Sequence, residues 1–207
     1  RTIPNTPLMK NLLEHIHGVS VETPIDLHEI FALDDVRPDE KEYDLIFISS
    51  DLNRGVKNPE LLRQIYHSPV LAKYRKLVVG KNSEAVIGSN SLLRIECRDF
   101  VGQQELHTLL GKSRLVIVCS LIESYSIVAV EAAQLGTVVL ASSNSACSGM
   151  MHRFFVVDSY HLDDWVERCA TILDNYSYYR AIFRTGFFET PPIKKLLADG
   201  REKSYPK

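Results

Sequence analysis

The fold is decided by the stretch Leu115-Val-Ile-Val-Cys119, Ser120-Leu-Ile-Glu-Ser-Tyr-Ser126, Ile127-Val-Ala-Val-Glu-Ala-Ala-Gln-Leu135, Gly136 and Thr137-Val-Val-Leu140. The two short, β-branched apolar runs predict strands that are covered on both faces. The apolar segment between them, stopped by a glycine, predicts a helix. A strand, a helix and a second strand in this order form the repeating unit of a parallel α/β sheet.

The same alternation continues on both sides of this stretch. The predicted strands are 45–48, 77–79, 92–95, 115–119, 137–140 and 154–157. The predicted helices begin at Pro59, Glu105, Ile127 and Leu162. This pattern predicts an α/β fold, a Rossmann-like doubly wound parallel sheet of about six strands.

The composition excludes several classes of protein. The chain has 207 residues, 45% of them hydrophobic and 24% charged, and a formal net charge of −2. We therefore expect no nucleic-acid partner, and no apolar run is long enough to predict a membrane span. Nor does any strand lead into Gly-x-Gly-x-x-Gly, which disfavours an NAD-dependent oxidoreductase.

The cysteines point to a reducing compartment. Cys97, Cys119, Cys147 and Cys169 form no Cys-x-x-Cys pair, and the chain shows no secretory signal pattern. Neither a zinc site nor a disulfide framework is therefore expected. Reduced cysteines predict a cytoplasmic protein.

The polar turn 120–126 is the first candidate for a binding site. Ligands of open parallel sheets bind beyond the carboxyl ends of the strands, where this turn lies. Backbone N–H groups near Ser126 and Ile127 begin the next helix, so they have no partner within the helix. These groups and the helix dipole favour an anion, and a diphosphate would fit.

Two glutamates flank this anion site. Glu123 precedes the helix and Glu131 lies within it. A carboxylate can accept hydrogen bonds from vicinal hydroxyls, so either could hold a sugar ring. Alternatively, Glu123 is a solvated loop acid and Glu131 an exposed helix residue. Because the neighbours of Glu131 in the sequence are apolar, its carboxylate needs a partner, and we favour the functional interpretation there.

The pattern Glu123-x7-Glu131, followed by Ala132-Ala133 and Gly136-Thr-Val-Val, resembles the signature of retaining GT-B glycosyltransferases of the glycogen-synthase and sucrose-synthase-like superfamily. The resemblance implies a C-terminal donor-binding domain that binds a UDP- or GDP-sugar for retaining hexosyl transfer. It implies that Glu123 is the catalytic residue beside the donor sugar and that Glu131 binds the ribose. No metal and no further cofactor is expected, because the nucleotide sugar is the substrate.

The resemblance extends to other segments. Arg54 and Lys57 follow the first strand, where the family has an Arg and a Lys that grip the diphosphate. Phe100 and Val101 resemble the segment that packs against the base. The remaining donor-binding residues implied are Ser124, Tyr125, Ser126 and Ile127. Ser124 and Ser126 depart from the family, which has glycine at both positions, and a serine resists positive φ.

The resemblance also divides the chain. Residues 1–42 are expected to be the remnant of an acceptor domain and a linker, 43–189 the nucleotide-sugar-binding domain, and 190–207 a tail. A carbohydrate or glycoconjugate acceptor would bind through an N-terminal domain that the chain mostly lacks, so the chain alone is expected to be inactive. The alternative is a catalytically inactive Rossmann-like binding or scaffold module, which the two serines favour and the two glutamates with Lys57 disfavour.

Overall fold

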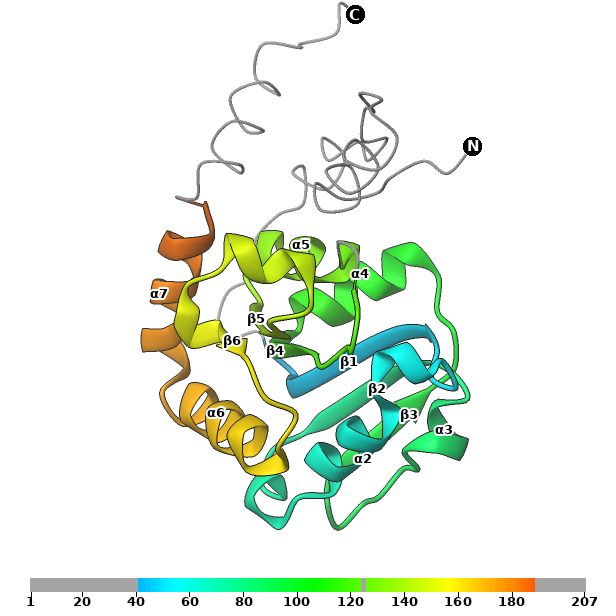
Figure 1. Cartoon of the computed structure of the whole chain (residues 1–207). Helices are drawn as coiled ribbons and strands as arrows, with labels where there is room; N and C mark the ends of the chain where they lie inside the picture. Colours follow the sequence, from blue (N-terminus) through cyan, green and yellow to red (C-terminus); the bar gives the residue numbers. More distant parts are fainter. Residues whose placement is uncertain (1–40, 124–125, 189–207) are drawn as a thin grey trace, which may run out of the picture.

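Six parallel strands form one sheet in the computed structural model, which describes residues 41–123 and 126–188 (Figure 1). The strands are β1 (Tyr43–Asp51), β2 (Lys76–Lys81), β3 (Ile95–Arg98), β4 (Ser113–Val118), β5 (Val138–Ser142) and β6 (Val156–Val157). Their order is β3-β2-β1-β4-β5-β6, and every neighbouring pair is parallel. The predicted Rossmann-like, doubly wound sheet is therefore confirmed.

Helices cover both faces of this sheet. They are α2 (Pro59–His67), α3 (Ser83–Val86), α4 (Gln103–Gly111), α5 (Ile127–Gln134), α6 (Leu162–Asp174) and α7 (Tyr176–Phe188). Single 3-10 turns are η3 (Gly55–Lys57), η4 (Pro69–Leu71), η5 (Ala146–Met150) and η6 (Arg153–Phe155). α4 packs against α5 on one face and α2 against α6 on the other, as right-handed crossovers require (Figure 1).

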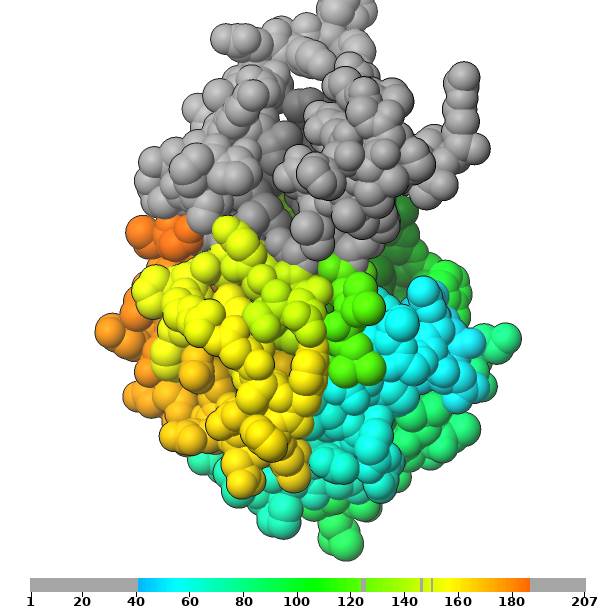
Figure 2. All heavy atoms as spheres, viewed as in Figure 1, coloured from blue at the N-terminus to red at the C-terminus, as the bar shows by residue number. Residues whose placement is uncertain are grey.

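The strands are central because their side chains are apolar on both faces. Leu45 and Ile46 of β1 and Leu115 of β4 are fully buried, and Leu45 lies opposite Leu115 in the register. In Figure 2 the η3–α2 segment (cyan) and the β6–α6 segment (yellow) meet in a continuous surface, and α2 packs against α6.

One glycine is required by a close approach of two strands. Gly80 of β2 has φ +143°, and a Cβ there would lie 1.8 Å from the carbonyl oxygen of Ser49. Ser49 lies where the register between β1 and β2 shifts. Gly80, which ends the predicted second strand, therefore leaves room for the backbone of Ser49, where β1 turns towards the next loop.

The third predicted strand, 92–95, was placed wrongly. Residues 91–94 form a turn, in which Leu92 is 89% exposed and Arg94 has φ 54°, and β3 begins only at Ile95. The sixth, 154–157, is shorter than predicted because Phe154 and Phe155 belong to η6. Their rings pack on α7, with Phe154 stacked on Tyr179 at 4.5 Å between ring centroids.

Helix α7 was not predicted from the sequence. The tyrosines of this helix obscure the apolar pattern of its buried face, on which Tyr176 and Phe183 lie. The predicted remnant at 1–42 lies almost wholly outside the described residues, as do the predicted tail and two donor-loop residues, Ser124 and Tyr125. Among the described helices, none has the length and apolar character that crossing a membrane requires.

Candidate donor site at the switch point of the sheet

The candidate site lies where the strand order reverses. β1 and β4 are neighbours, but the chain leaves them towards opposite edges of the sheet. Their following loops meet, because the amide of Leu121 donates to the carbonyl of Val56 at 2.8 Å. The thiol of Cys119 lies 3.6 Å from the carbonyl oxygen of Lys57. Such a switch point is where open α/β sheets bind their ligands.

An ion pair joins the two loops. The Lys57 ammonium contacts Oε2 of Glu123, and both side chains are mostly buried. Ser120 Oγ lies 3.4 Å from the same carboxylate oxygen, and the amide of Glu123 donates to Asn144 at 3.2 Å. The fold therefore brings together a cation and a carboxylate that are distant in the sequence but were both predicted to be site residues.

Helix α5 begins beside this pair. Its N-cap, Ser126, has φ 53° and ψ 73°, and the side chain makes no capping hydrogen bond. Among the described residues, the amides of Ile127 and Val128 have no backbone acceptor. The serine thus adopts the left-handed conformation in which glycine is favoured, and the first-turn amides of α5 have no acceptor within the helix itself.

Glu131 is buried, which excludes the exposed-residue alternative. It is 6% exposed, and its Oε1 lies 3.0 Å from Nε2 of His107 on α4. The partner that the apolar surroundings of Glu131 required is therefore a histidine. His107 was not among the predicted site residues, because the sequence pattern of α4 gives no sign that this side chain faces α5.

The remaining predicted residues lie around the two loops. Arg54 is exposed and precedes η3, and its carbonyl accepts from the amide of Lys57 at 2.9 Å. Phe100 is 73% exposed, whereas Val101 packs against the core just before α4. The structure brings Lys57 and Glu123 into contact. Among the described residues, the side chains of Arg54 and Phe100 form no hydrogen bond or ion pair with them.

The cysteines near the site are not activated. All four are free thiols. Burial raises the pKa of Cys119 to about 12 and that of Cys147 to about 11. At neutral pH these two side chains are protonated and poorly nucleophilic.

Within the described ranges, no three His, Cys, Asp or Glu side chains are grouped as metal ligands would be.

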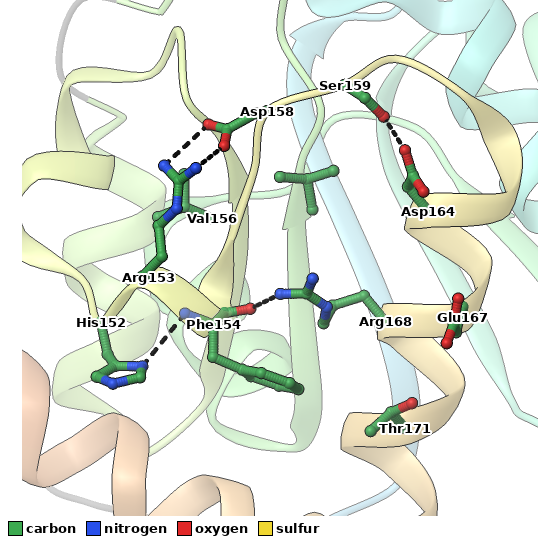
Figure 3. A pocket seen from close by; sticks show the side chains of 11 residues that line it. His152, Arg153, Phe154, Val156, Asp158, Ser159, Asp164, Glu167, Arg168 and Thr171 are labelled. Atoms are coloured by element: carbon green, nitrogen blue, oxygen red, sulfur yellow. Dashed lines mark hydrogen bonds and ion pairs between the residues drawn. The ribbon is translucent and has the colours of Figure 1, made fainter.

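A separate hollow of about 700 Å³ lies between η6, β6 and α6 (Figure 3). Arg153 pairs with Asp158 across it, and Arg168 donates to the carbonyl of Phe154 while lying 4.5 Å from the centroid of that ring. None of the predicted donor residues lines this hollow. This hollow is therefore distinct from the candidate site at the switch point.

The fold and the site define an α/β protein with a Rossmann-like, doubly wound sheet and a group of polar residues at its carboxyl edge. The family described as glycosyl transferases group 1 matches residues 42–175, and the chain belongs to this family. A search of curated proteins found no match.

Solved structures of glycosyltransferases share the fold. Anabaena Alr3699/HepE in complex with UDP-glucose matches with a TM-score of 0.67 at 13% identity, over 97% of this chain and 62% of that one. Sucrose-phosphate synthase from Thermosynechococcus elongatus gives 0.71 at 15% identity, over 97% and 56%. The catalytic domain of a Helicobacter pylori cholesterol-alpha-glucosyltransferase gives 0.58 at 17% identity, over 76% and 99%. The chain thus spans about three fifths of the first two proteins, and these similarities establish the GT-B type of Rossmann-like fold.

Proposed function

We propose that the chain is the C-terminal, donor-binding domain of a retaining glycosyltransferase that uses a UDP- or GDP-sugar. The observation that carries this proposal is the contact between Lys57 and Glu123, in the loop that leads into the first turn of α5. A cation, helix amides and a carboxylate are the groups that a sugar diphosphate requires. The complex of Alr3699/HepE with UDP-glucose supports this choice of ligand.

In this proposal each group has a distinct role. The diphosphate lies between the Arg54–Lys57 turn and the start of α5 at Ser126 and Ile127, with Ser124 and Tyr125 completing the loop. Lys57 then turns from Glu123 to the phosphates, where it stabilises the charge that develops as the bond between the sugar and the diphosphate breaks. No metal is required for that step.

The two glutamates hold the two sugar rings. Glu123, released from Lys57, faces the transferred hexose as the catalytic residue. Glu131 accepts hydrogen bonds from the ribose hydroxyls, and the segment Phe100–Val101 packs against the base. The acceptor, a carbohydrate or glycoconjugate, binds through an N-terminal domain, and the cytoplasmic location indicated by the cysteines stays a prediction.

The second candidate is an inactive binding or scaffold module. The serines at 124 and 126 suggested it, because the family has glycine there. The conformation of Ser126 argues against it: the left-handed backbone is kept although it costs a non-glycine residue about 1–2 kcal/mol. A loop whose function had been lost would be expected to relax that strain.

Calorimetry with UDP, GDP, UDP-glucose and a GDP-hexose tests the proposal. We expect one nucleotide series to bind, and we expect Glu123→Gln to leave the affinity for the free nucleotide nearly unchanged while lowering that for the nucleotide sugar. Absence of binding to every nucleotide and nucleotide sugar would favour the scaffold alternative. An equal loss for both ligands would remove the sugar-facing role of Glu123.

A further inference from the structure

Within the part of the chain that the structure describes, His107 is the side chain that bonds to the carboxylate of Glu131. Nε2 of His107 lies 3.0 Å from Oε1, and the Glu131 side chain is 7% exposed against 21% for His107. Ala129, Val130, Ala132 and Ala133 around it on α5 are all buried. Among the described residues no second side chain bonds to this carboxylate. Without His107, a buried acid would be left in an apolar environment.

Helix α4 links this pair to the segment expected at the base. Phe100 and Val101 directly precede α4, which begins at Gln103 and packs against α5. His107 follows four residues later, roughly 6 Å along the helix axis at 1.5 Å per residue. The segment expected at the base and the side chain that holds the expected ribose ligand are therefore close along the chain, on either side of the start of α4.

The chemistry of imidazole suits a carboxylate that must also bind a ligand. One N–H group of His107 can occupy Oε1 and leave Oε2 as an acceptor. An arginine in the same place would tend to bind both oxygens in a bidentate pair. The observed pairing thus fixes the carboxylate without using its full hydrogen-bonding capacity.

We infer that His107 is a positioning residue for nucleotide binding, whose Nε2 N–H holds Oε1 of Glu131 and so presents Oε2 to the ribose hydroxyls. This inference rests on the proposed function, because it needs a ribonucleotide at the switch point. It adds a residue on α4 to a site otherwise built from the loops after β1 and β4 and from α5.

The test compares His107→Leu and His107→Gln with the wild-type chain by calorimetry. The ligands are UDP or GDP, whichever the wild type binds, and the matching 2′,3′-dideoxynucleoside diphosphate. We expect His107→Leu to weaken the ribonucleotide about tenfold, as for one lost charge-assisted hydrogen bond. His107→Gln, whose amide N–H can reach a similar position, should retain most of the affinity. The dideoxy ligand should bind wild type and His107→Leu equally.

The controls separate positioning from general damage. His161→Leu, an exposed residue before α6, should leave both affinities unchanged. If His107→Leu does not fold, His107→Asn replaces it, because the shorter amide cannot reach Glu131 and should lose affinity where His107→Gln does not.

Two results would overturn the inference while leaving the proposed function intact: equal ribonucleotide affinity in wild type and His107→Leu, or an equal loss with the dideoxy ligand. Failure of the wild type to bind any nucleotide would instead overturn the proposed function, and this inference with it.

Discussion

At the scale of single residues, the ion pair between Lys57 and Glu123 decides how the site is interpreted. Each group neutralises the other, and both side chains are largely shielded from solvent. A bound diphosphate would compete with Glu123 for the ammonium group. In the proposed function, Lys57 and Glu123 would therefore separate when the donor binds.

Lys57→Ala should weaken nucleoside diphosphate binding by about 1.5–3 kcal/mol, the range for a charge-assisted hydrogen bond. Titration calorimetry with the nucleotide that the wild type binds measures the loss. Lys112→Ala is the matched control, because Lys112 is an exposed cation that pairs with Glu42 before β4, at the opposite edge of the sheet. Equal nucleotide affinities of Lys57→Ala and the wild type would show that Lys57 does not bind the diphosphate.

At the scale of elements, the start of α5 and the end of α4 each carry an unfavourable feature. Ser126 begins α5 in the left-handed conformation. At the other end of the sheet, the buried ammonium of Lys41 donates to the carbonyl of Gly111, the last residue of α4, at 2.7 Å. Ser126 lies at the candidate site, whereas Lys41 is buried at the opposite end of the sheet.

Ser126→Gly should raise the free energy of unfolding by about 0.5–1 kcal/mol, because glycine adopts positive φ without strain but is more flexible in the unfolded chain. Ser177→Gly, at an exposed position in α7, should lower it by a similar amount. Urea denaturation of the three proteins checks both signs. A loss of stability in Ser126→Gly would show that the serine side chain supports the loop.

Lys41 should make stability depend on pH. Burial, and then the nearby positive charges of Arg180 and Arg114, lower its pKa from 10.5 to about 7. At pH values between these two pKa values, Lys41 binds more protons in the unfolded chain than in the folded one. Its contribution to the free energy of unfolding therefore rises as the pH rises from about 7 to 9.

Lys41→Met should remove that increment, and Lys112→Met should keep it. Urea denaturation at both pH values measures the difference. An unchanged pH dependence in Lys41→Met would mean that the lysine remains charged in the folded protein.

At the scale of the whole molecule, the sequence predicted the sheet and the pair of loops correctly, because buried parallel strands have continuous apolar runs that end in polar turns. It could not place β3, since Leu92 and Leu93 suggest a strand where the chain makes a turn. It also missed α7 and His107. Their roles depend on which elements pack together, and no local pattern in α4 records that α5 is its neighbour.

The chain alone should have no appreciable transferase activity, even if it binds the donor. In a two-domain enzyme the reaction takes place between the domains, whose closure aligns the acceptor. An assay with labelled UDP- and GDP-hexoses and a broad set of carbohydrate acceptors measures this. Robust turnover would show that the described domain, with the rest of this chain, completes a catalytic site.

The proposed function places the donor at the switch point between β1 and β4. A crystal structure with the nucleoside diphosphate that binds in solution tests this location most directly. We expect the diphosphate between Lys57 and the first turn of α5, with the ribose at Glu131 and the Lys57–Glu123 pair opened. A nucleotide bound elsewhere, such as in the hollow beside β6 and α6, would contradict it.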